Sequence, residues 1–162
     1  MTKTAEEVIR EEWDMLKKTG LLSQLGCSAG PKKKSNIFLW NALMKGPKNS
    51  PFEGYMFQFE ISFPQNYPSS APSVFCKTPI YHMNIQEKTG KVCVTSITSS
   101  DGWKNAQDIS TVLSSIFIIL SKPNPDSPYR RDIANLYKDN KNEYEKNVKE
   151  YCKKNAIKIP EE

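Results

Sequence analysis

Four cysteines and one histidine are the side chains of this 162-residue sequence best able to do chemistry. A thiolate is a strong nucleophile that can also carry an acyl group. The cysteines are scattered, without a Cys-x-x-Cys pair, at Cys27, Cys76, Cys93 and Cys152. With His82 as the single histidine, a zinc site would be hard to assemble, and a domain of this size needs no disulfides. We therefore expect reduced thiols, each more often a small buried side chain than a nucleophile.

Residues 78–105 are the stretch in which we expect the least regular structure, apart from a short piece at Lys91–Val94. An irregular stretch of this length inside a compact domain is usually functional or disordered. This one contains aromatic side chains as well as His82 and Cys93, which disfavours disorder. The site is predicted here. The residues alone leave open a thiol hydrolase in which the His82 imidazole activates the Cys93 thiol.

The elements that position this stretch can be predicted from hydrophobic periodicity. A capping box at Thr4 to Glu7 precedes an amphipathic helix over roughly residues 5–18. Strands are predicted at 37–43, at 55–63, where apolar residues alternate most cleanly, and at 73–77. Short connections between them favour an antiparallel meander of three or four strands.

Three helices are predicted after the irregular stretch. The first is capped by Asp108 or Ser110 and is apolar on nearly every face, so it should be buried. The second opens with Ser127 as N-cap and Pro128 in the first turn. The third ends near Cys152. The fold class is therefore α+β, with an N-terminal helix, a meander of about four strands, an irregular active-site segment and three helices.

Charge and hydropathy exclude several function classes. The net charge of +5, from 23 basic and 18 acidic residues, contains only one basic run, Lys32 to Lys34, which is too little to indicate nucleic-acid binding. Mean hydropathy is −0.61, and the longest strongly apolar run, Ile116–Leu120, is far too short for a membrane span. No targeting signal is found near the N-terminus, so we expect a cytoplasmic location, with the nucleus also open.

Several motifs, in their order and spacing, resemble those of the ubiquitin-conjugating enzymes, and the resemblance runs from about residue 5 to residue 154. Any one alone would be weak. The motifs are Cys27-Ser28-Ala29-Gly30-Pro31, Gly46-Pro47 with Ser50-Pro51-Phe52-Glu53-Gly54, Phe63-Pro64 with Tyr67-Pro68, Tyr81-His82-Met83-Asn84-Ile85, Gly90-Lys91-Val92-Cys93-Val94, Trp103, and Pro123-Asn124-Pro125-Asp126-Ser127-Pro128.

The resemblance implies a single catalytic domain over residues 1–162 and a reaction cycle without a cofactor. Cys93 matches the cysteine that takes ubiquitin as a thioester from an activating enzyme and passes it to a substrate lysine or a ligase cysteine. Asn84 matches the asparagine that donates to the developing oxyanion or supports the adjoining loop; it could also merely close a turn. Asp126 matches the acid that orients the attacking lysine, and it could equally cap the helix that follows.

Further residues take structural or partner-facing roles by the same resemblance. His82, Tyr81 and Trp103 are implied to support the active-site loop, which gives His82 a structural role in place of a catalytic one. Pro68, Ser69, Asn105 and Ala106 match loops that face RING- or HECT-type ligases, and Ser28 matches a position that can contact a second ubiquitin on the far side of the sheet.

The sequence also departs from the family pattern. Met83 replaces a usual proline, so we expect a looser loop and a less pre-organised Asn84. Thr95 stands where many members have an acid, and the first helix carries Glu6, Glu7, Glu11 and Glu12 where basic residues commonly face the activating enzyme. These changes leave open a conjugating enzyme for another ubiquitin-like modifier. A non-catalytic scaffold of the same fold is the third reading, and the presence of Cys93 disfavours it.

Overall fold

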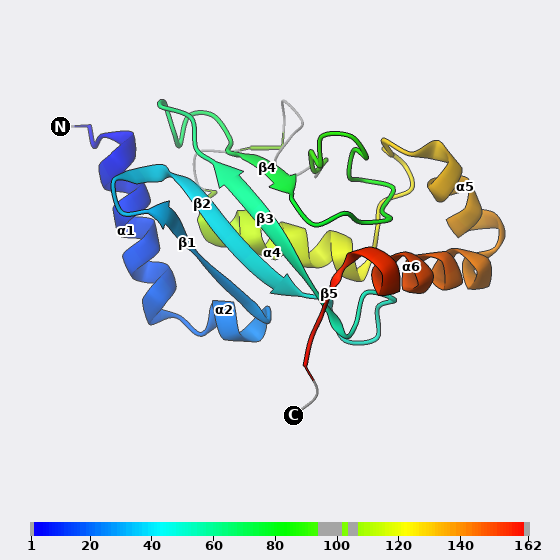
Figure 1. Cartoon of the computed structure of the whole chain (residues 1–162). Helices are drawn as coiled ribbons and strands as arrows, with labels where there is room; N and C mark the ends of the chain where they lie inside the picture. Colours follow the sequence, from blue (N-terminus) through cyan, green and yellow to red (C-terminus); the bar gives the residue numbers. More distant parts are fainter. Residues whose placement is uncertain (1, 94–101, 104–106, 161–162) are drawn as a thin grey trace.

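The computed structural model describes residues 2–93, 102–103 and 107–160. Figure 1 shows an N-terminal helix, a twisted sheet and a group of C-terminal helices, which confirms the predicted α+β class. The elements are α1 (Ala5–Lys18), α2 (Leu21–Gln24), β1 (Cys27–Lys33), β2 (Asn36–Lys45), β3 (Tyr55–Ser62), β4 (Ser73–Cys76), α4 (Ile109–Ser121), α5 (Arg131–Asp139), α6 (Lys141–Asn155) and β5 (Ile157–Lys158).

The sheet is an antiparallel meander in the order β1-β2-β3-β4, as predicted. The period-two pattern of β3 has its expected consequence, because Phe57, Phe59 and Ile61 are all fully buried on one face. The short strand β5 adds to the start of β3, where Tyr55 pairs with Lys158. This fifth strand was not predicted, since its two residues carry no periodicity.

Strand β1 is likewise absent from the strands predicted from the sequence. It contains Gly30 and Pro31, which are poor strand formers. It forms because β2 offers a complete partner edge, with pairing from Cys27 opposite Met44 to Pro31 opposite Trp40. A proline is tolerated there because β1 is the outer strand of the sheet.

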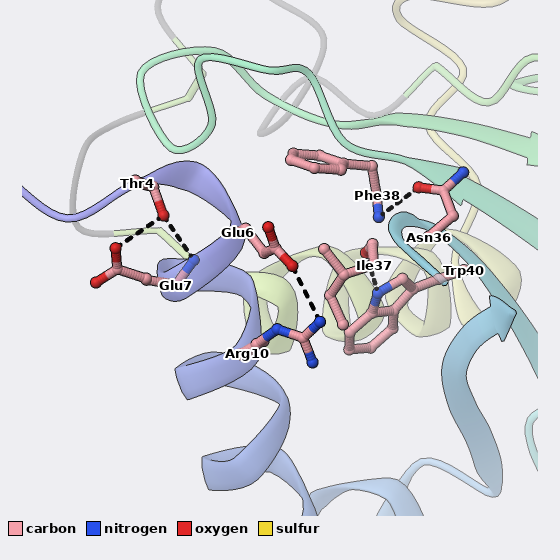
Figure 2. Close-up of polar contacts among 8 residues, drawn as sticks. All are labelled: Thr4, Glu6, Glu7, Arg10, Asn36, Ile37, Phe38 and Trp40. Carbon is pink, nitrogen blue, oxygen red and sulfur yellow. Dashed lines mark hydrogen bonds and ion pairs between the residues drawn. The ribbon is translucent and has the colours of Figure 1, made fainter. Parts of the chain in front are cut away.

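The predicted start of α1 is confirmed, although its capping box is only half formed. Figure 2 shows the Glu7 N–H donating to the Thr4 hydroxyl oxygen at 3.1 Å. The Glu7 carboxylate accepts from the Thr4 hydroxyl at 3.0 Å, where a full box would have it accept from the Thr4 backbone. The helix then buries Ile9 and Leu16 against β2 and α4.

Trp40 lies at the centre of the core and is fully buried. Its indole N–H donates to the Ile37 carbonyl at 2.9 Å, as Figure 2 shows. The Trp13 and Phe63 rings meet it edge-on, with centroids at 6.0 and 5.5 Å. The indole therefore joins α1 to the sheet without leaving a buried donor unpaired.

Helix α4 crosses one face of the sheet in Figure 1 and is capped by Asp108, whose carboxylate accepts from the Thr111 N–H at 3.1 Å. Most of its apolar residues are buried, as expected, but Ile118 is 59% exposed. Within the described residues, no helix is both long and apolar enough to span a bilayer.

The predicted start of the next helix is wrong. Ser127 is not an N-cap and Pro128 is not in a first turn, because α5 begins at Arg131 with Arg130 as its N-cap. The backbone N–H groups of Tyr129 and Arg130 instead donate to the carbonyl of Met83, at 2.8 and 3.1 Å. These bonds tie residues 129 and 130 to the irregular segment, and the helix starts only after them.

Candidate active site

Cys93 lies at the end of a short two-stranded ladder inside the irregular segment. Ile85 and Val92 form an antiparallel bridge, and the Cys93 N–H donates to the Asn84 carbonyl at 2.8 Å. The Gln86 N–H donates to the Lys91 carbonyl at 2.9 Å, which continues the ladder toward the turn. The short piece predicted at Lys91–Val94 is thus confirmed up to Cys93, and Val94 lies outside the described residues.

Gly90 fixes this ladder to the edge of the sheet. Its carbonyl accepts from the Cys76 N–H at 2.7 Å, and its φ of +77° is one that residues with a side chain rarely adopt. A Cβ at this position would lie only 2.2 Å from the Cys76 carbonyl oxygen. The glycine therefore permits a close approach that sets where Cys93 stands.

The four cysteines lie in different parts of the fold. Burial raises the pKa of the Cys27, Cys76 and Cys152 thiols to about 12, which leaves almost no thiolate at neutral pH. Cys93 is half buried, as Cys27 is, and it lies on the irregular segment. Of the four, it is the only one within residues 78–105, where the sequence predicts the site.

His82 cannot serve as a base for that thiol. The ring is fully buried, stacks on Phe52 at 5.7 Å, and uses both nitrogens on the backbone. Nδ1 accepts from the Asn84 N–H at 3.0 Å, so Nε2 carries the proton and donates to the Ile119 carbonyl at 2.8 Å. Burial lowers the pKa of His82 to about 4. The imidazole is therefore a neutral structural link, and the thiol-hydrolase reading has no base.

Asn84 ties the cysteine segment to the loop before α5. The residue is 1% exposed. Its side-chain oxygen accepts from the Asn124 N–H at 2.9 Å, and its side-chain nitrogen donates to the carbonyls of Asn124 at 2.8 Å and Ser127 at 3.5 Å. Both ends of the amide are thus engaged with this loop, which favours the loop-support role over that of a mere turn residue.

Met83, which replaces the usual proline, is packed and hydrogen-bonded within the chain. The side chain is fully buried, and its carbonyl accepts from both Tyr129 and Arg130. The Met83–Asn84 pair therefore makes contact with Cys93 on one side and with residues 124–130 on the other. Two backbone acceptors and one side-chain amide bring the two segments together.

Asp126 is exposed on this loop, close in sequence to its anchor points. Its backbone N–H donates to the Asn124 side chain at 3.0 Å, an Asx turn that fixes the loop locally. Its interpretation as a helix cap is wrong, since α5 begins five residues later. Among the described residues its carboxylate has no hydrogen-bond or ion-pair partner, so it can accept one from a ligand.

Tyr81 and Trp103 support different parts of the site. The Tyr81 ring packs near Tyr144 and Tyr151 of α6, and the Arg130 guanidinium lies 5.5 Å from its centre. Trp103 donates its indole N–H to the Pro68 carbonyl at 2.7 Å. The tryptophan is therefore fixed to the predicted ligase-facing loop.

The predicted partner-facing residues are spread over two regions. Pro68 is half buried and Ser69 exposed at the loop held by Trp103, whereas Ser28 is exposed on β1, opposite Leu43 of β2. Asn105 and Ala106, also predicted to face ligases, lie outside the described residues, as does Thr95.

The acidic first helix has partners within the chain. Glu6 pairs with Arg10 at 3.0 Å and Glu11 with Lys3 at 2.7 Å. Glu12 is half buried, and its carboxylate accepts from the Tyr67 hydroxyl at 2.5 Å and from the Ile109 N–H at 3.0 Å. Burial raises the pKa of Glu12. Glu12 thus joins α1, the Tyr67–Pro68 loop and the start of α4, a role that no sequence pattern revealed.

Comparison with known proteins agrees with this geometry. The family model described as ubiquitin-conjugating enzyme matches residues 9–152. The chain belongs to the ubiquitin-conjugating enzymes. It is 42% identical over 118 residues to a probable ubiquitin-conjugating enzyme of Acanthamoeba polyphaga mimivirus, with 73% of each chain covered. It is 36% identical over 154 residues to a probable ubiquitin-conjugating enzyme of Arabidopsis thaliana, covering 95% of this chain and 94% of the relative.

A third relative, ubiquitin-conjugating enzyme E2 N of Drosophila melanogaster, is 40% identical over 132 residues, which cover 82% of this chain and 85% of the relative. This ubiquitin-conjugating enzyme is therefore a transferase of the ubiquitination system. Within the described residues, no three His, Cys, Asp or Glu side chains gather where they could hold a metal ion.

Proposed function

We propose that Cys93 accepts ubiquitin as a thioester from an activating enzyme and passes it to a substrate lysine or to a ligase cysteine. The observation that carries this proposal is the half-buried Cys93 thiol at the end of the 84–93 ladder, beside the loop that Asn84 anchors. A thiolate suits such a relay because it is both a good nucleophile and a good leaving group.

In the loading step, the Cys93 thiolate attacks the thioester carbonyl of the activating enzyme, and the thiolate of that enzyme leaves. In discharge to lysine, the lone pair of the neutral amine forms a C–N bond to the carbonyl carbon, and the C–S bond breaks to return a thiolate on Cys93. The extra proton on nitrogen goes to water or to a carboxylate. The residues of the chain need only position these groups and stabilise the tetrahedral state.

We further propose that Asn84 acts mainly by positioning the loop that carries Asp126. Support comes from the side-chain amide, which is already bonded to Asn124 at both ends. An oxyanion role would require the amide to leave the Asn124 carbonyl. Asp126, exposed and without a partner among the described residues, is proposed to accept a hydrogen bond from the attacking amine and orient it.

The expected partners are an activating enzyme, a RING- or HECT-type ligase that uses the loop at Pro68 and Ser69, and ubiquitin itself. The proposed location is cytoplasmic, with the nucleus also open. The remaining alternative is that the enzyme conjugates another ubiquitin-like modifier in place of ubiquitin, and the acids of the first helix motivate it. The internal partners of Glu6, Glu11 and Glu12 give those acids a structural explanation and so weaken that alternative.

The test is a loading assay with an activating enzyme, ATP and a panel of modifiers, read on a non-reducing gel. We expect a ubiquitin adduct that a thiol reductant removes. Cys93→Ser should give a reductant-resistant ester or no adduct, while the matched control Cys27→Ser, also at a half-buried thiol, should load normally. A reductant-sensitive adduct on Cys93→Ser would overturn the assignment of the site, and loading of a different modifier alone would overturn ubiquitin.

The role of Asn84 is tested by comparing loading, discharge and stability in Asn84→Ala. Two backbone groups of the half-buried Asn124 lose their partner, which should reduce the free energy of unfolding by about 1–3 kcal/mol. Loading should be nearly normal and discharge to free lysine slow. Slow discharge with unchanged stability would instead favour direct donation to the oxyanion.

A further inference from the structure

Tyr129 stands out among the exposed apolar side chains. It is 42% exposed and is the only aromatic among the large hydrophobic residues that the described part of the chain leaves exposed, the others being Met15, Leu43, Ile118 and Ile157. An exposed aromatic ring of this kind often marks a contact surface. No sequence pattern singled out this tyrosine, although it directly follows the last proline of the Pro123 to Pro128 motif.

Backbone hydrogen bonds connect both Tyr129 and Cys93 to the Met83–Asn84 pair. Its N–H donates to the Met83 carbonyl at 2.8 Å, while the Cys93 N–H donates to the carbonyl of the next residue, Asn84, also at 2.8 Å. Tyr129 and Cys93 are therefore each one hydrogen bond from adjacent residues. Burial and, as the smaller cause, the charge of Cys93 raise the pKa of the Tyr129 phenol. The phenol is thus protonated at neutral pH.

The next residue, Arg130, has its charge compensated within the chain. The Arg130 guanidinium lies 3.8 Å from Glu87 and 3.3 Å from Asp132, and it covers the Tyr81 ring. Its charge is therefore compensated and its side chain is turned toward the protein, at 21% exposure. Arg130 therefore adds no uncompensated positive charge beside Tyr129 that would repel an incoming lysine.

We propose that Tyr129 is an acceptor-binding residue, whose ring packs along the alkyl chain of the lysine that attacks the Cys93 thioester and whose hydroxyl oxygen accepts a hydrogen bond from the lysine nitrogen. This inference rests on the proposed thioester function. An aromatic ring beside a lysine stem gives contact area and partial desolvation, which favours the neutral amine that must attack. The phenol keeps its own proton throughout, and the amine proton leaves to water or Asp126.

The inference is tested by single-turnover discharge of the Cys93 thioester with a concentration series of free lysine, and separately with hydroxylamine, which has no alkyl chain. Tyr129→Ala should raise the half-saturating lysine concentration roughly 3- to 10-fold. Tyr129→Phe should raise it less, by roughly 2- to 5-fold, the effect of one lost neutral hydrogen bond. Discharge to hydroxylamine and loading by the activating enzyme should be unchanged in both variants.

Ile157→Ala is the matched control, because Ile157 is exposed to a similar extent, 45%, but lies on β5. An unchanged half-saturating lysine concentration in Tyr129→Ala overturns the inference, as does an equal slowing with hydroxylamine, which would place the effect on the thioester itself. If only Tyr129→Phe equals the wild type, the hydrogen bond is refuted and the ring contact stands. Failure of the wild type to load would overturn the proposed function. Normal loading, with a half-saturating lysine concentration that is the same in the Tyr129 variants as in the wild type, overturns this inference alone.

Discussion

Acidification should destabilise the protein through its single histidine. His82 is fully buried, with Nδ1 accepting from the Asn84 N–H and Nε2 donating to the Ile119 carbonyl. Protonation would place a second proton on Nδ1, facing an N–H group, and a charge in the core. The folded state therefore resists protonation until the pH approaches about 4, while the unfolded chain takes up the proton near 6.5.

The sign and size follow from this difference. Between pH 6.5 and about 4 the unfolded state binds more protons than the folded state, so stability is complete above this window and is lost as the pH falls through it. At about 1.36 kcal/mol per pH unit, the full loss is about 3 kcal/mol. Below the folded-state pKa the contribution of His82 no longer changes.

The measurement is urea unfolding, followed by tryptophan fluorescence at several pH values between 7 and 4, for the wild type and His82→Gln. The glutamine amide can donate and accept but does not titrate. Because every other group is shared, the difference in unfolding free energy between the two proteins isolates His82. We expect the unfolding free energy of the wild type, relative to that of His82→Gln, to fall by about 3 kcal/mol as the pH is lowered from 6.5 to about 4.

Proton NMR gives an independent reading of the same prediction, because a single histidine makes the imidazole resonance unambiguous. In the folded protein this resonance should not shift between pH 7 and pH 5. A titration near 6.5, or an unfolding difference that is flat with pH, would falsify the reasoning. Either result would also reopen the hydrolase reading, since it would mean that the imidazole reaches solvent.

Two further predictions concern stability. Gly90→Ala should destabilise the protein more than Gly54→Ala and should impair loading of Cys93. Both glycines have positive φ, which costs roughly 1–2 kcal/mol when the residue has a side chain. Of the two, only Gly90 would also bring its Cβ against a carbonyl oxygen, at 2.2 Å. Equal losses in thermal or urea unfolding would contradict the importance of that close approach. Glu12→Gln should gain stability relative to the wild type as the pH rises from about 4.5 toward 7. Burial raises the pKa of Glu12, so ionisation of this carboxyl destabilises the folded state of the wild type. Urea unfolding of the two proteins across this range measures the trend, and a relative loss for the glutamine variant would show that the bonds from Tyr67 and Ile109 favour the carboxylate more than burial disfavours it.

The parts of the fold predicted from the sequence are those in which a local signal and the tertiary packing agree. Alternation in Tyr55–Ser62 predicts β3 because one face of that strand is buried, and the Thr4 to Glu7 pattern predicts the start of α1 because a cap acts within one helical turn. Strand β1 lacks such a signal. Its Gly30 and Pro31 form a strand only because β2 supplies hydrogen bonds from another part of the chain.

The site divides in the same way. Motif positions led to the proposal of Cys93. The hydrogen bonds of His82 to Ile119 and of Asn84 to Asn124 could not be predicted in this way, because they join residues 37 and 40 positions apart. The error at Ser127 has the same origin. A serine followed by proline is a good local start for a helix, yet two backbone bonds to the Met83 carbonyl outweigh it and delay α5 to Arg131.

Met83 shows how a departure from a family pattern can leave a site ordered. A proline at this position would restrict the backbone through its own ring and would limit the residue before it. Methionine imposes neither restriction, but its side chain is fully buried and its carbonyl accepts two N–H groups from residues 129 and 130. Order that proline would supply locally is supplied here by packing and by the loop before α5. Since that loop carries both Asp126 and Tyr129, the positions of these two proposed acceptor residues depend on the Met83 contacts.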